Sequence, residues 1–364
     1  MRHSILIFAS LLSCVEATCG QSPKSVQAIL AEDGDRFPGG LVKCHVPASA
    51  DEPFATSFSL RNAARSLDLA ALNWQNQPRQ QCSQCHANML YLCARPALTG
   101  VLEEPPAVAE LFEHIVASRW EKHGLLYPVE SVAIAVPLAM HDRQTRGTLH
   151  PVTRKALDRM AAAQQADGTW GDTAGGKYAF FRRYEQTLFA AVGIAQAPDE
   201  YAATEIGQRT LARIRQYAAM NPPKTAHAKG MLLWASAHTE GLADNDDRKA
   251  AADQLLALQR ADGGWALRRL LADDPRQPAG KPAADLPSDG YGTGFVVFAL
   301  RKGGIPASDP RLQKGVAWLK SHQRESGRWF HPTLSDRPNH VLSNTATAWA
   351  VMALQACGET QGGQ

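Results

Sequence analysis

The sequence predicts an all-α fold, an α/α toroid of about five helix pairs with a loop-rich N-terminal segment. Three observations predict it: a helix-end motif occurs three times, apolar helices alternate with amphipathic ones, and no stretch alternates apolar and polar residues as a strand would. The chain has 364 residues, of which 45% are apolar and 20% charged. This composition is ordinary for a globular protein and excludes disordered, collagen-like and coiled-coil chains.

The N-terminus has the pattern of an export signal. Arg2 and His3 give a positive start, residues 5–12 are apolar, and Ala17 ends a small-residue cleavage site. The apolar stretch is shorter than the roughly 20 residues that a membrane span needs. A second interpretation stays open, because residues 11–14 (Leu-Leu-Ser-Cys) resemble a lipobox that would make Cys14 a lipid anchor. We expect an exported, periplasmic protein without a transmembrane segment.

Residues 82–86, Cys-Ser-Gln-Cys-His, have the spacing of covalent c-type haem attachment. We expect Cys82 and Cys85 to bind the vinyl groups of a haem c, with His86 as the proximal iron ligand. Arg95 is a candidate partner for a haem propionate, and Met140 is a weak candidate for the sixth ligand because of its distance along the chain. A disulfide, a redox thiol pair and half of a zinc site stay open as alternatives.

The remaining cysteines and histidines are not assigned by the sequence. Cys44 and Cys93 are a candidate disulfide pair, and Cys357 is a candidate buried thiol, while Cys19 has no expected partner. A five-coordinate iron is an alternative to a sixth ligand. The other candidates for that ligand are His141, His227, His322, His331 and His340.

The repeated motif places a Gln, a Gly and a Trp at fixed offsets. We expect the Gln to bind backbone groups exposed at the end of a helix, the Gly to form a turn, and the indole to pack on the last helical turn. These residues are therefore structural rather than catalytic. The three copies are Gln164, Gly168 and Trp170; Gln259, Gly263 and Trp265; and Gln323, Gly327 and Trp329.

Two sets of helices alternate along the chain. The apolar set suits an inner ring, and the amphipathic set suits an outer ring with one face in water. A further helix is expected near 57–72. The inner set covers 130–140, 185–194, 226–237, 291–300 and 344–354, and the outer set covers 107–121, 151–164, 203–218, 248–259 and 309–322.

These observations divide the chain into four parts. They are a signal peptide over 1–17, an N-terminal extension with the haem motif over 18–105, the toroid over 106–357, and a tail over 358–364. A separate cytochrome domain over 31–150 is a weaker alternative, because residues 130–140 fit better as the first inner helix.

The repeats resemble the QW motif of the squalene–hopene and oxidosqualene cyclase family and of prenyltransferase β-subunits, over about residues 130–356. Residues 289–294 and 344–350 also look like starts of inner helices in that family. The resemblance implies a toroid whose inner helices surround an apolar space suited to a hydrophobic small molecule. It does not by itself fix the function.

The resemblance also suggests where to look for a catalytic acid. Class II cyclases protonate their substrate from a D-x-D-D motif, and residues 244–247 have that sequence, with Asp246 as the candidate acid. However, the amphipathic helix that follows favours helix capping at this place. Asp285 and Asp289 open an inner helix, although their spacing departs from the family's. All three are weak candidates, and the chain is about half the size of two-domain triterpene cyclases.

The main interpretation is an exported haem c protein on a cyclase-like toroid, with a redox or electron-transfer role, a redox partner protein and a hydrophobic substrate. One alternative is a terpene or triterpene cyclase or isomerase without haem, and another is a lipid- or protein-binding module. The formal charge of +3, from 38 basic and 35 acidic residues, does not favour nucleic-acid binding. Whether the protein is an enzyme stays open at this point.

Overall fold

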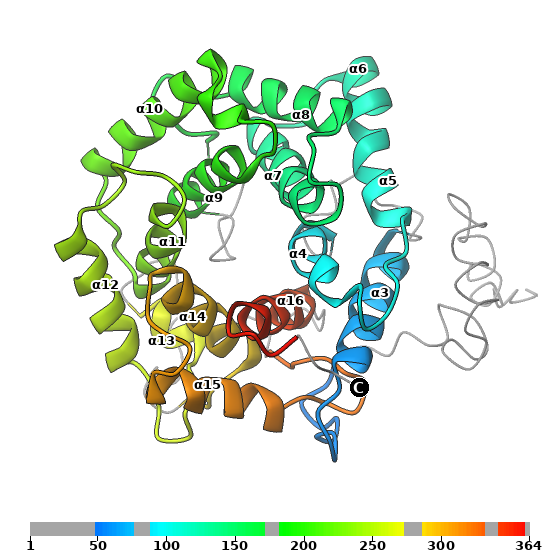
Figure 1. Cartoon of the computed structure of the whole chain (residues 1–364), viewed down its shortest axis with the longest axis vertical. Helices are drawn as coiled ribbons and strands as arrows, with labels where there is room; N and C mark the ends of the chain where they lie inside the picture. The colour runs from blue at the N-terminus through cyan, green and yellow to red at the C-terminus, as the bar shows by residue number, and fades with distance from the viewer. Residues whose placement is uncertain (1–47, 76–87, 172–181, 273–285, 332–340, 361–364) are drawn as a thin grey trace, which may run out of the picture.

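A computed structural model describes residues 48–75, 88–171, 182–272, 286–331 and 341–360. In these residues the helices form an inner and an outer ring around one axis, as Figure 1 shows. Each inner helix contacts the next, and the last lies against the first, so the ring is closed. The inner helices are α4 (Asn88–Ala94), α7 (Pro128–Thr145), α9 (Arg183–Gln196), α11 (Ala226–Ser236), α14 (Gly290–Lys302) and α16 (Val341–Ala356).

The outer ring covers the other face of the inner helices (Figure 1). Its polar residues face water, and its apolar stripe packs inward. A short helix, α13 (Leu267–Leu270), lies between α12 and α14 in the chain. The outer helices are α3 (Leu60–Gln75), the run of α5 (Ala107–His114), a π-helical turn (Ile115–Arg119) and α6 (Trp120–His123), then α8 (Pro151–Ala162), α10 (Glu205–Met220), α12 (Asn245–Ala257) and α15 (Pro310–Ser321). The predicted all-α toroid is confirmed.

The ring begins earlier in the chain than the sequence indicates. Residues 60–75 form an outer helix, and residues 88–94 form the inner helix between α16 and α7. The described residues therefore form six helix pairs rather than about five, and the ring extends beyond the boundary expected at residue 106. All seven residues of α4 are buried. Two helical turns are too short for an apolar period to become visible in a sequence.

The position of α7 also excludes a separate domain over 31–150, because α7 is a full member of the inner ring and packs against α9. The predicted signal peptide lies outside the described residues and stays a prediction. Among the residues that the structure describes, no helix combines the length and apolar character needed to cross a bilayer.

Each copy of the repeated motif links two neighbouring outer helices. In the first copy, the amide of Gln164 donates to the carbonyl of Gly168 in its own turn at 3.0 Å and to that of Thr210 in α10 at 3.2 Å. The expected capping is confirmed, and the second bond adds a contact between repeats. The other copies follow the same scheme, from Gln259 to Gly263 and Arg311 and from Gln323 to Gly327 and Ser59.

The Trp of each copy is buried beneath its own helix and donates its indole N–H to a carbonyl ten residues earlier. This bond satisfies one carbonyl near the helix end while the ring fills the space between the two rings of helices. The three bonds are Trp170 to Met160 at 2.7 Å, Trp265 to Leu255 at 2.7 Å and Trp329 to Leu319 at 2.8 Å.

The third copy of the motif closes the ring between the two ends of the chain. The side chain of Gln323 accepts from the backbone N–H of Ser59 at 2.8 Å and donates to the carbonyl of Ser59 at 2.9 Å. Two residues before α3 further support the contact, since Ala55 donates to the carbonyl of Gln323 and the carboxylate of Glu52 accepts from Ser326.

Gly327 allows this close approach. Its φ is +88°, and a Cβ at this position would lie 2.1 Å from the carbonyl oxygen of Asn62 in α3. Only glycine combines this backbone conformation with such a short distance between the last turn and the first outer helix.

We expect Gln323→Ala to lower the free energy of unfolding by about 1–3 kcal/mol, because it leaves the part-buried backbone groups of Ser59 and the buried carbonyl of Gly327 without this partner. Chemical denaturation followed by circular dichroism measures this change. The matched control is Gln313→Ala on the exposed face of α15, where one surface bond to Ala307 is lost; its effect should stay within about 0.5 kcal/mol. Equal losses in the two variants would contradict the closure role of Gln323.

Candidate functional site

Aromatic side chains cover the face of α14 that looks toward the ring axis. Trp234 of α11 and Trp349 of α16 touch each other with ring centroids 5.7 Å apart, although α14 stands between their helices. The helices α13 and α15 cover the outward face of α14. The contact between Trp234 and Trp349 therefore lies on the face of α14 that looks toward the ring axis. Phe298 and Phe295 of α14 join it, at 5.0 Å from Trp234 and 5.1 Å from Trp349. With Phe189 of α9, which contacts Trp234, these residues form the aromatic cluster.

Three polar side chains lie at the end of the aromatic cluster where the inner helices begin. The Nδ1 atom of His227 is 3.5 Å from a carboxylate oxygen of Glu185, and its Nε2 atom is 3.1 Å from the hydroxyl oxygen of Tyr291. The imidazole also stacks on Phe295 with ring centroids 4.3 Å apart. All three residues are buried. We call them the Glu–His–Tyr group.

The three residues meet because each stands in the first turn of a different inner helix, α9, α11 or α14. Parallel packing of these helices brings their N-terminal ends to one side of the ring. Thr225 caps α11 by accepting from the N–H of Ala228 at 3.1 Å, which fixes the turn that carries His227. The positive end of the α9 dipole stabilises a negative charge on Glu185.

The surroundings keep both His227 and Tyr291 uncharged. Burial lowers the pKa of His227, and the opposing effect of Glu185 does not outweigh it. Burial also raises the pKa of the Tyr291 hydroxyl. In the tautomer that suits both partners, Nδ1 carries the hydrogen toward Glu185 and Nε2 accepts from Tyr291. A neutral imidazole held between a carboxylate and a phenol can accept and return a proton.

Asp289 is the predicted acid that the structure brings next to this group. It caps α14 by accepting from the N–H of Gly292 at 2.7 Å, and its other oxygen accepts from the N–H of Leu267 at 2.8 Å. The Nδ1 atom of buried His331 lies 2.8 Å from the same carboxylate. Asp289 therefore joins the start of α14 to two neighbouring segments, and its contacts are those of a structural cap.

The other two acidic candidates lie elsewhere. The D-x-D-D sequence forms the exposed start of outer helix α12, where Asp244 accepts from the N–H of Asp247 at 2.8 Å. Asp246 is exposed in that first turn, away from the inner ring. Asp285 lies outside the described residues.

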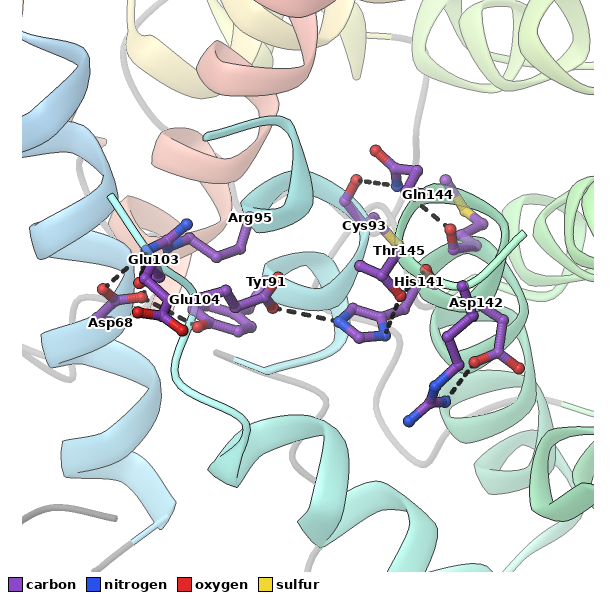
Figure 2. A network of polar contacts seen from close by, with 12 residues as sticks. Asp68, Tyr91, Cys93, Arg95, Glu103, Glu104, His141, Asp142, Gln144 and Thr145 are labelled. Carbon is purple, nitrogen blue, oxygen red and sulfur yellow. Dashed lines mark hydrogen bonds and ion pairs between the residues drawn. The ribbon is translucent and has the colours of Figure 1, made fainter. Parts of the chain in front are cut away.

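Arg95, the candidate propionate partner, has a partner for its charge within the protein. It is fully buried and forms an ion pair with Asp68 at 2.8 Å, and it also donates to the carbonyl of Glu103 at 2.7 Å. The hydroxyl of Tyr91 donates to the same carboxylate, so both side chains point at Asp68 in Figure 2. The carboxylate belongs to α3, a helix that the sequence analysis expected outside the toroid. The role of Arg95 beside a haem propionate stays a prediction.

Met140 is buried in α7 near the C-terminal end of α4. Gln144 links the two helices by donating to the carbonyl of Cys93, as Figure 2 shows, and to the carbonyl of Met140. The haem-motif residues Cys82, Cys85 and His86 lie outside the described residues, so the haem c and its sixth ligand stay predictions. In the described part of the chain, no three His, Cys, Asp or Glu side chains gather as a metal site would require.

Neither remaining cysteine prediction is tested in full. The buried thiol of Cys93 faces the carbonyl of Met89 at 3.5 Å, and its predicted partner Cys44 lies outside the described residues. Cys357 is a half-buried free thiol, and burial raises its pKa to about 11.

From its sequence pattern His227 is only a haem-ligand candidate, and nothing in that pattern singles out Glu185 or Tyr291. A signal for them was present: each is a polar side chain in the first turn of a helix that is otherwise apolar. Glu130 has the equivalent place in α7, where it pairs with Arg119. When successive apolar helices each carry a polar residue in the first turn, this pattern indicates that the polar residues lie together at one end of a ring.

Comparisons with known proteins point to one family. The squalene–hopene cyclase C-terminal domain matches residues 289–364. The chain is 36% identical over 77 residues to a probable squalene–hopene cyclase of Sinorhizobium fredii and 39% identical over 75 residues to a squalene–hopene cyclase of Bradyrhizobium diazoefficiens. The match to the Sinorhizobium protein covers 20% of this chain and 12% of that relative. The match to the Bradyrhizobium protein covers 19% of this chain and 11% of that relative.

A longer match covers 150 residues of a squalene–hopene cyclase of Zymomonas mobilis, with 31% identity, 39% of this chain and 20% of the relative. The matches thus span at most a fifth of the length of these relatives. Among solved structures, an ent-copalyl diphosphate synthase from Streptomyces platensis superposes with a TM-score of 0.49 and 17% identity, over 76% of this chain and 50% of the other.

The family and sequence matches support a cyclase-like toroid and overturn the main functional interpretation of the sequence. The matching family is one of squalene–hopene cyclases, so the redox or electron-transfer role was wrong. The alternative of a cyclase or isomerase without haem fits better.

The lowered pKa of His227 predicts a pH-dependent stability. Below the unfolded-state pKa of about 6.5, the unfolded chain binds a proton that the buried imidazole does not. The free energy of unfolding should therefore fall as the pH decreases from 7 toward 5, by up to about 1.4 kcal/mol per pH unit from this residue. Urea denaturation of the wild type and of His227→Phe at each pH checks it, since the variant should show a shallower decrease. Parallel pH profiles would contradict the assignment.

Proposed function

We propose that the protein binds a terpenoid chain against the aromatic cluster and moves a proton on it, as an isomerase or cyclase that needs no haem. The observation that carries the proposal is the contact between the Glu–His–Tyr group and the aromatic cluster, made by His227 stacked on Phe295. One end of the buried aromatic cluster thus bears a group that can transfer protons.

The family match supports the proposal at this place in the molecule. Residues 289–364, which resemble the squalene–hopene cyclase C-terminal domain, include Tyr291 of the polar group together with Phe295, Phe298 and Trp349 of the aromatic cluster. Glu185, His227 and Trp234 come from helices outside that match and complete the site. The relatives' names refer to squalene and hopene, and a long apolar polyprene is the substrate class that we infer.

The chemistry of the site is redox-neutral. Removal of a proton from a carbon next to a cationic centre forms a C=C bond, and the C–H electron pair becomes the new π bond. The cationic centre itself forms when the imidazolium of His227 gives a proton, through the Tyr291 hydroxyl that contacts its Nε2 atom, to one carbon of a C=C bond, whose π electron pair forms the new C–H bond. The proton that is lost afterwards returns to His227 by the same route, so the substrate and product are isomers. Glu185 stabilises the imidazolium, and the Tyr291 hydroxyl holds the ring in place.

The aromatic cluster supplies the second requirement, which is to stabilise positive charge on carbon in a dry place. The faces of Trp and Phe rings attract cations, and the attraction is strongest where water is absent. Trp234, Phe295 and Trp349 are each fully buried. Charge that develops on a polyprene beside them is therefore stabilised by rings and shielded from water that would trap it.

The test is to incubate the full chain with squalene and with geranylgeraniol and to analyse the extract by gas chromatography and mass spectrometry. We expect products of unchanged mass and a new retention time. His227→Phe should lower their rate of formation by about 10²–10⁴-fold, the usual contribution of a general base. Tyr201→Phe is the matched control, since it removes a buried hydroxyl that bonds Asp158 away from the site.

No product of unchanged mass from either substrate would overturn the proposal. Equal losses in His227→Phe and Tyr201→Phe, with both variants folded, would overturn the role of the Glu–His–Tyr group.

A further inference from the structure

Phe295 joins the Glu–His–Tyr group to the rest of the aromatic cluster. Its ring stacks on the imidazole of His227, with centroids 4.3 Å apart and an angle of 15° between the two planes. A second ring, that of Trp349, meets Phe295 at 74° with centroids 5.1 Å apart. All three side chains are fully buried. The imidazole therefore lies flat on a ring that is itself packed against a neighbouring helix.

Gly230 of α11 leaves the space that Phe295 occupies. A Cβ at this position would lie 2.7 Å from both the Cε1 and the Cζ atom of Phe295, which is closer than a real Cβ approaches another carbon. Glycine inside a helix lowers helix stability relative to alanine, so its use here needs a reason in the packing. The reason is the ring of Phe295, which is enclosed by Gly230 on one side and by Trp349 on another.

This enclosure matters because the two nitrogens of His227 contact different helices. Nδ1 lies 3.5 Å from a carboxylate oxygen of Glu185, and Nε2 lies 3.1 Å from the hydroxyl oxygen of Tyr291. The outer torsion of a histidine side chain is soft, so two polar contacts alone leave the ring free to turn. Turning would drive the edge of the imidazole into the face of Phe295. The stacked ring thus keeps each nitrogen directed at its own partner.

The same contact acts on the charge that His227 takes up during proton transfer. Burial lowers the pKa of His227, Glu185 opposes this effect, and Arg182 adds to it. The face of an aromatic ring attracts a cation, and this attraction is strongest where water is absent. Phe295 therefore favours the imidazolium without bringing another charge into the site, and Tyr291, on the far side of Nε2, stays uncharged.

We propose that Phe295 is a positioning residue that holds His227 in one orientation and one tautomer, with the hydrogen on Nδ1. Because His227 is the proton-transferring residue of the proposed function, the role of Phe295 rests on that function. It also separates Phe295 from the other rings of the aromatic cluster. One face of Phe295 is covered by the imidazole and is closed to a substrate, so this face acts on His227 and not on a polyprene.

Nuclear magnetic resonance of the full chain, labelled with isotopic nitrogen in its histidines, tests this role, because the two imidazole nitrogens have different chemical shifts in each tautomer. The signals of His227 are those that are absent from His227→Phe. In the wild type at neutral pH we expect the hydrogen to be fixed on Nδ1. In Phe295→Leu the two tautomers should mix, and the shifts of the two nitrogens should move toward each other.

The matched control is Phe298→Leu, which removes another buried ring from the same helix. In the described part of the chain, the ring contacts of Phe298 are with Trp234 and Trp349. This variant should leave the His227 signals unchanged, whatever its effect on substrate. A general loss of packing in the aromatic cluster would instead change them in both variants.

Gly230→Ala is a second test that keeps every aromatic ring and displaces Phe295 by one added methyl group. It should change the His227 signals as Phe295→Leu does, and each variant should lower kcat with a polyprene by about 10²-fold, as a small misplacement of a catalytic group does. Added to Phe295→Leu, it should have no further effect, since the methyl group then has room. Gly193→Ala is its control, because the new Cβ would lie 2.5 Å from Val136 in a contact away from the site.

Unchanged His227 signals in Phe295→Leu, or equal changes in Phe298→Leu, overturn the positioning role. If Phe295→Leu does not fold, the signals of Gly230→Ala decide in its place, and equal changes in Gly193→Ala overturn the role. If the wild type isomerises a polyprene while neither Phe295→Leu nor Gly230→Ala alters the signals, the positioning role alone fails. If the signals change as expected while the wild type forms no isomer, the proposed function alone fails.

Discussion

The hydrogen bonds of the repeated Gln are the interaction on which the rest of the structure depends. An inner helix of this protein is apolar on nearly all sides, so it is stable only when an outer helix covers it and neighbours flank it. The Gln fixes the outer helices relative to one another, because its amide binds both its own turn and the next outer helix, as Gln164 does with Gly168 and Thr210. The buried Trp of the same motif then sets the distance between the two rings.

This arrangement explains why the polar groups of the inner helices gather at two ends. When parallel helices stand around an axis, first turns meet on one side and last turns on the other. The first side holds Glu185, His227 and Tyr291, beside helix N-termini that stabilise negative charge. The second side holds Lys302 and Arg143, beside helix C-termini that favour cations. Between them the side chains are aromatic. One end of the ring therefore favours negative charge, the other end favours positive charge, and the part between them is apolar.

The sequence predicted the ring but only part of what it contains. The fixed offset from Gln323 to Trp329 and the alternation of apolar and amphipathic helices are local patterns, and they identified five of the six pairs. The pair of α3 and α4 was missed because α4 has only seven residues. The Glu–His–Tyr group was missed because its members are far apart in the chain, and only the order of helices around the ring shows that they meet. The ion pair between Arg95 and Asp68 was missed for a related reason, because Asp68 lies in α3 and α3 was not expected in the ring.

The bond between Gln323 and Ser59 joins residues 264 positions apart, and this has a consequence for how the chain folds. Every earlier contact between outer helices can form as soon as the next repeat is present, whereas closure must wait for nearly the whole chain. Forming so long a loop costs entropy that grows slowly with its length, and non-local contacts of this kind slow folding. During synthesis the protein therefore exists first as an open arc with an apolar edge at each end. That edge is covered only when the C-terminal helices arrive, so closure of the ring buries the apolar surface that the arc exposes.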